Sequence, residues 1–105
     1  PTEPNITIGV NSSELAVLAA QLNCSVNIRW NHEYLSSILS AYQNEAKMRG
    51  TNASISVWMP WNLEHTENQE AIVPFADLGV DRVVFLTTQP QHFSELLNLG
   101  NFLFP

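Results

Sequence analysis

Four short apolar segments alternate along the chain with longer segments of helical periodicity. The apolar segments span residues 6–10, 26–30, 55–59 and 82–86, and they are rich in β-branched and aromatic residues, which indicates strands. A turn signal and then a helical pattern follow each of them. This β-α-β-α-β-α-β-α order predicts an α/β fold of about four βα units, with parallel strands joined by right-handed crossovers.

Two of the helices have clear start or stop signals. The first is predicted to begin at residues 11–14, where Asn11 can cap free backbone N–H groups and Glu14 can bond back, as in a capping box. Its apolar face is predicted to hold Leu15, Leu18, Ala19 and Leu22. The second is predicted to begin near residues 31–33 and to end at Gly50, with Lys47 and Arg49 in its last turn.

Proline complicates the C-terminal part of the pattern. A third helix is predicted to begin at residues 66–69, but Pro74 falls inside its apolar pattern. Either that helix kinks, or a second short helix begins at Pro74 and ends at Gly79. The last helix is predicted over residues 91–99, between Pro90 and Gly100.

Four βα units fit either a small open sheet or half of an eight-stranded barrel. An open sheet would be covered on both faces, whereas a half-barrel would leave two strand edges and its inner face uncovered. No low-complexity linker divides the 105 residues, so a single domain is expected. A half-barrel would expose one set of strand side chains, Ile6, Ile8, Val26, Ile28, Val57, Val83 and Phe85 or their alternates. A homodimer or pairing with an N-terminal half-barrel is therefore predicted.

Composition argues against several classes of protein and of site. Ten acidic residues against four basic ones give a net charge of −6, and the four bases are scattered, which argues against a nucleic-acid partner. The only cysteine, Cys24, excludes an internal disulfide and a zinc site built on several thiolates. No apolar run approaches about 18 residues, so no membrane span is expected. The start of the chain lacks a signal-peptide pattern, and a cytoplasmic location is predicted.

The loop after the first strand is the most suggestive candidate site. In parallel α/β folds, ligands bind at the carboxyl ends of the strands. Here Gly9 ends a strand, and Val10, Asn11, Ser12 and Ser13 lead into a helix whose free N–H groups and positive dipole end attract a phosphate. The simpler interpretation, that Asn11 and Ser12 only cap the helix, stays open.

Aromatic and titratable residues lie at the same ends of the predicted strands. Trp30, Trp58 and Trp61 suit either a flat ligand pocket or a cover and oligomer interface. His32 suits proton transfer or phosphate bonding, or it is merely an exposed residue at a helix start. No metal-ligand spacing, P-loop or nucleophile motif occurs, so no metal is predicted and no catalytic acid or base is assigned.

The stretch ITIGVNSSELAVLAAQLNCSVNIRW resembles the bacterial luciferase-like monooxygenase superfamily, which includes flavin- and deazaflavin-dependent oxidoreductases. Residues 53–61, ASISVWMPW, look like the strand that follows in the family. Residues 76–85 are similar to its final helix–strand junction. Val10 stands where the family pattern has a second glycine, and residues 22–25 replace its Ala-Asp-Gly stretch.

The resemblance covers nearly the whole chain and implies the C-terminal half of a (β/α)8 TIM-type barrel. It implies that residues 9–12 hold the phosphate of FMN or a deazaflavin coenzyme, and that Trp30, Trp58 and Trp61 border the ring or a small-molecule substrate. The oxidoreductase or monooxygenase chemistry would belong to the cofactor. Because the N-terminal half is missing, the isolated chain is expected to be inactive. The alternative is a non-catalytic half-barrel remnant or assembly module, which the missing half and Val10 favour.

Overall fold

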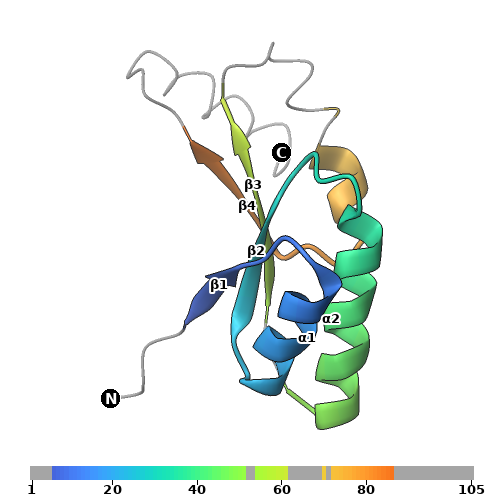
Figure 1. The fold of residues 1–105 in the computed structure, drawn as a ribbon. Coiled ribbons are helices and arrows are strands. Elements are labelled where there is room, and N and C mark those ends of the chain that lie inside the picture. The colour runs from blue at the N-terminus through green and yellow to red at the C-terminus, as the bar shows by residue number, and fades with distance from the viewer. Residues whose placement is uncertain (1–5, 52–53, 62–69, 71, 87–105) are drawn as a thin grey trace, which may run out of the picture.

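The computed structural model describes residues 6–51, 54–61, 70 and 72–86. They form a four-stranded parallel sheet with two α-helices and a short 3-10 helix (Figure 1). In chain order the elements are β1 (Thr7–Gly9), α1 (Ser13–Gln21), β2 (Ser25–Arg29), α2 (Leu35–Arg49), β3 (Ile55–Pro60), η1 (Val73–Phe75) and β4 (Arg82–Leu86). The α/β fold and all four predicted strands are confirmed. The helix starts predicted at residues 66–69 and 91–99 lie outside the described residues.

The strands lie in the sheet in the same order as in the sequence, β1-β2-β3-β4, and every neighbouring pair is parallel. α1 and α2 lie on the same side of this sheet (Figure 1). A doubly wound sheet would need a reversal of strand order to place helices on both faces. In the described part of the chain, one face is therefore covered by helices and the other is open.

The two faces of the sheet differ sharply in chemistry. Val26, Ile28 and Val57 are fully buried under the helices. Side chains alternate along a strand, so the residues between them project from the open face. That face carries mostly polar residues in β1 to β3, with Arg82 at the start of β4: Thr7, Ser25, Asn27, Arg29, Ser56, Trp58 and Arg82. Of the apolar set named in the sequence analysis, Val26, Ile28 and Val57 are buried under the helices, Ile8, Val83 and Phe85 are half-buried, and Ile6 is exposed.

α1 departs most from its prediction. Its N-cap is Ser12, whose Oγ accepts a hydrogen bond from the Leu15 amide at 3.2 Å, so the predicted cap at Asn11 and the capping box are wrong. Its buried residues are Ala16, Ala19 and Ala20. Of the predicted apolar face, Leu15, Leu18 and Leu22 are instead 41%, 47% and 60% exposed. The alanines face α2 because their small side chains allow the two helices to pack closely.

α2 starts later than predicted, at Leu35, because residues 30–34 form turns before it. Its end is as predicted: Gly50 adopts the left-handed conformation with φ 67°, and Lys47 and Arg49 occupy the last turn. Tyr42 joins this helix to the start of β2, because its hydroxyl donates to the Cys24 carbonyl at 2.7 Å. The apolar stripe of α2 thereby closes the first core, over β1 and β2.

The connection from β3 to β4 contains the second core. η1 is a single 3-10 turn over Val73–Phe75 that contains Pro74, and residues 76–79 after it form turns up to Gly79. The predicted alternative of a short helix from Pro74 to Gly79 is therefore wrong. Trp61 is 1% exposed and packs edge-on against Phe85, with ring centroids 4.7 Å apart. The Asp81 carboxylate accepts from the Ile55 amide at 2.9 Å, which ties the entry of β4 to the start of β3.

Candidate functional site

A pocket of about 470 Å³ lies at the carboxyl ends of β1 and β2. Its lining comes from the β1–α1 loop, the open face of the sheet and the β2–α2 loop: Gly9, Val10, Asn11, Leu15, Asn27, Arg29, His32 and Trp58. Three of the residues predicted from sequence, Gly9, Val10 and Asn11, line it directly. Ser12 and Ser13 follow them as the cap and first residue of α1.

The start of α1 supplies donors next to this pocket. The Leu15 amide is bonded to Ser12 Oγ and the Ala16 amide to the Ser12 carbonyl. The amides of Ser13 and Glu14, in the first turn, have no acceptor within the helix. With the positive end of the helix dipole, they favour an anion at this position.

Gly9 keeps the floor of the pocket open. A Cβ built on Gly9 would meet no other atom within 4 Å. Val10 is buried, and its amide donates to the Asn27 carbonyl at 3.0 Å. The amide of Val10 is therefore used in the sheet and does not contribute to an anion site.

Arg29 and Trp58 are the lining residues that bring charge and a flat ring to the open face. They are register partners on β2 and β3. Arg29 is exposed and makes no ion pair within the described part of the chain. From the sequence, Arg29 is one of four scattered basic residues and is not a predicted site residue. The signal that could have placed it is the alternation in β2, in which Asn27 and Arg29 lie on the face opposite to Val26 and Ile28, the same face as Gly9.

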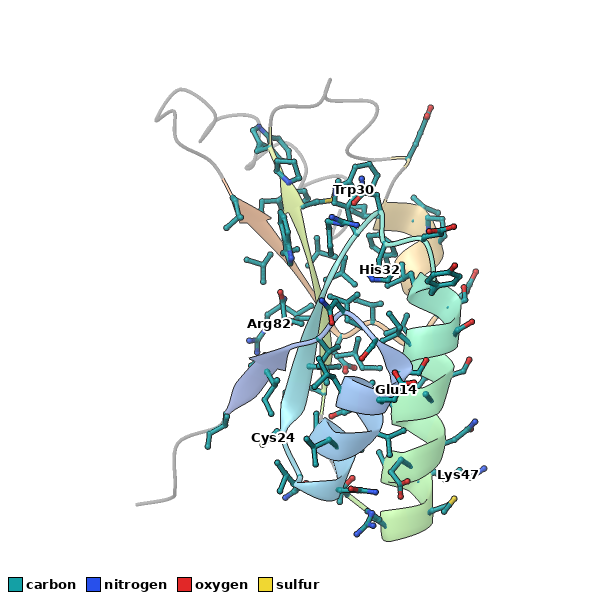
Figure 2. The ribbon with its side chains drawn as sticks, in the orientation of Figure 1. Glu14, Cys24, Trp30, His32, Lys47 and Arg82 are labelled. Atoms are coloured by element: carbon teal, nitrogen blue, oxygen red, sulfur yellow. The ribbon has the colours of Figure 1, made fainter. Side chains whose placement is uncertain are left out.

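His32 links the two loops at the pocket. His32 lies in the loop before α2 (Figure 2). Its Nδ1 accepts from the Tyr34 amide at 3.0 Å, so Nε2 carries the proton that is donated to the Asn11 carbonyl at 3.1 Å. Both ring nitrogens are thus engaged with the backbone. In this arrangement His32 positions the β1–α1 loop and has no free nitrogen for proton transfer.

The other two tryptophans lie away from the pocket lining. Trp61 is part of the second core, where it packs against Phe85. Trp30 is half-buried against that same core, and its amide donates to the Trp58 carbonyl at 3.0 Å. Of the three tryptophans expected to border a ligand, the structure brings only Trp58 into the pocket.

Among the described residues, the titratable group with a clearly shifted pKa is Tyr42, which lies outside this pocket. Its pKa is raised to about 12, mainly by burial and in smaller part by Cys24 and Asp81. Among the described residues no three histidine, cysteine or acidic side chains gather as a metal site would require. Within the same residues, no helix is long and apolar enough to cross a membrane.

Comparison with known protein families and with curated proteins found no match for this chain.

Proposed function

We propose that this chain is part of a luciferase-like flavin- or deazaflavin-dependent oxidoreductase or monooxygenase, in which it binds the phosphate and ring of FMN or a deazaflavin. The observation that carries the proposal is the pocket where the start of α1, Arg29 and Trp58 meet. The amides of Ser13 and Glu14 would hold the phosphate, and the Arg29 guanidinium would add charge to the same pocket. Trp58 would border the ring.

The residues that line the pocket fit the phosphate and the ring of FMN or a deazaflavin. A phosphate needs donors, and the described residues that line the pocket include no acidic one, although the Glu14 carboxylate belongs to the same first turn of α1. A flat ring needs room and an apolar wall, which the open space over Gly9 and the Trp58 indole supply. His32 would hold the β1–α1 loop in place at Asn11, next to both the phosphate and the ring.

The proposed fold around this site is the C-terminal half of a (β/α)8 barrel. Sequential parallel strands with helices on one face support it, because this is the arrangement of a barrel wall. The open polar face would then line the barrel interior. The proposed location is the cytoplasm, in keeping with a single buried, unpaired cysteine.

The cofactor, once bound, would supply hydride transfer or oxygen chemistry to a small-molecule substrate. The residues of this chain would position it and keep water from its phosphate end. The alternative function is a non-catalytic module that retains the fold. It is favoured by the engagement of both His32 nitrogens, because the lining then offers no free acid or base.

A binding measurement tests the proposal. FMN and a deazaflavin are titrated into the full chain and followed by fluorescence. The variant Ser12→Asp keeps a good N-cap but places negative charge at the phosphate position, so it should weaken binding by more than tenfold and leave folding intact. Ser37→Asp, which adds the same charge at an exposed position of α2, is the matched control.

The two outcomes separate the functions. Binding by the parent and by Ser37→Asp, with loss in Ser12→Asp, supports the cofactor site. Absence of detectable binding by the parent at millimolar ligand would leave residues 9–13 as a helix cap and favour the non-catalytic module.

A further inference from the structure

An apolar groove follows β4 on the helix-covered side of the sheet. It has a volume of about 330 Å³, and its apolar walls come from the η1 region, with Ile72, Phe75 and Ala76, and from the strand, with Val83 and Phe85. Asp81 and Arg82 add charge at the start of the strand. β4 is the last strand in the sheet order. No described element covers the groove, although α1 and α2 cover the equivalent surface over the other strands (Figure 1).

The segment that follows β4 has the length and pattern to fill this groove. Three residues join β1 to α1 and five join β2 to α2. The connection from β4 to the helix predicted over residues 91–99 would be residues 87–90. Its length of four residues falls between those of the other two connections. The predicted helix carries Phe93, Leu96 and Leu97 at helical spacing. If this helix packs back onto the sheet as α1 and α2 do, it lies on the same face as they do.

We propose that residues 91–99 of the same chain dock in this groove, with Phe93, Leu96 and Leu97 against it. The tether explains why the chain's own segment, rather than a second copy, occupies the groove. A connection of four residues gives a local concentration in the millimolar range, far above that of a free partner at micromolar concentration. The proposal does not depend on the cofactor site.

Cysteine cross-linking in the full chain tests the docking. Cys24, the only native cysteine, is buried and is replaced by alanine to give a clean background. Ala76→Cys, at the exposed rim of the groove, is then combined with Leu97→Cys or, as the matched control, with Asn98→Cys. Under mild oxidation the Leu97→Cys pair should form an intrachain disulfide at least tenfold faster, as measured by intact mass and non-reducing gels.

Equal rates for the two pairs would overturn the proposal. Disulfides formed only between chains would overturn it too, and would indicate a second copy in the groove. A second measurement uses Ala76→Cys alone, in the Cys24→Ala background. Adding Leu97→Asp should raise the rate of maleimide labelling at position 76 several-fold, whereas adding Asn98→Asp should not. An unchanged labelling rate with Leu97→Asp would contradict the docking.

Discussion

Tyr42 is the residue whose hydroxyl fixes α2 to the sheet. It is 1% exposed, and its hydrogen bond reaches the carbonyl of Cys24, a residue 18 positions earlier in the chain. The same burial that makes this bond strong also disfavours the charged phenolate, which raises the pKa of Tyr42 to about 12. A single side chain thus couples the packing of α2 to the pH of the solution.

Stability should therefore fall at alkaline pH. Between pH 10 and 12 the unfolded chain releases the Tyr42 proton while the folded chain retains it, so the free energy of unfolding decreases as pH rises through this window. Below pH 10 the contribution is fully present. Urea denaturation across this range should show the decrease in the parent and a shallower one in Tyr42→Phe.

Tyr42→Phe should also lower the free energy of unfolding at neutral pH. Removing the hydroxyl leaves the Cys24 carbonyl without its partner and should cost about 1 kcal/mol or more at pH 7. Tyr34→Phe is the control, because Tyr34 is 61% exposed and loss of its hydroxyl should leave the free energy of unfolding at pH 7 unchanged. An alkaline decrease in Tyr42→Phe equal to that of the parent would contradict the assignment.

At the scale of elements, the turn between η1 and β4 depends on one glycine. Gly79 has φ +81°, and a Cβ on it would overlap the Gln43 amide. That amide donates to the Leu78 carbonyl at 2.9 Å and so holds the turn against α2. The left-handed backbone conformation favours glycine at this position, and a side chain here would also displace the Gln43 amide from its hydrogen bond.

Gly79→Ala should lower the free energy of unfolding by about 1–3 kcal/mol, the usual cost of a left-handed conformation in a residue with a side chain. Gly9→Ala is the matched control, since its Cβ meets no atom within 4 Å and its φ is not positive. Urea denaturation of both variants measures the difference. Equal effects at the two positions would show that the Gly79 conformation is not the cause.

At the scale of the whole molecule, α1 presents an apolar surface that the described residues do not cover. Leu15, Leu18 and Leu22 share one side of the helix, and Ile6, which lies just before β1, is 60% exposed. In the part of the chain that the structure describes, β1 and β4 are the outer strands of the sheet. Because water-exposed leucines and unpaired strand edges favour association, we expect a homodimer or pairing with an N-terminal half-barrel.

Sedimentation of the full chain tests the homodimer. Leu18→Lys should weaken association at least tenfold, because it places a charge in the middle of the leucine surface. Met48→Lys, at a position 79% exposed on α2, is the control and should leave association unchanged. A stable, well-folded monomer of the parent at micromolar concentration would contradict the expectation.

Local patterns in the sequence were enough for the strands, the helix end at Gly50 and the position of the β1–α1 loop. These features depend on neighbouring residues: alternation and β-propensity define a strand, and a glycine tolerates the left-handed cap. The start of α1 was harder, because Asn11 and Ser12 are both good caps. The structure selects Ser12, and the Asn11 carbonyl instead accepts from His32, 21 residues away.

Taken alone, the sequence determined the alternation of strands and helices and the end of the sheet at which the candidate pocket lies. The tertiary structure decided which residues meet there. It buried Trp61 in the second core, aligned Arg29 with Trp58, and turned the alanines of α1 rather than its leucines toward α2. The reason is that these choices depend on contacts between elements far apart in the chain, where the available space selects among residues that local propensity treats as equivalent.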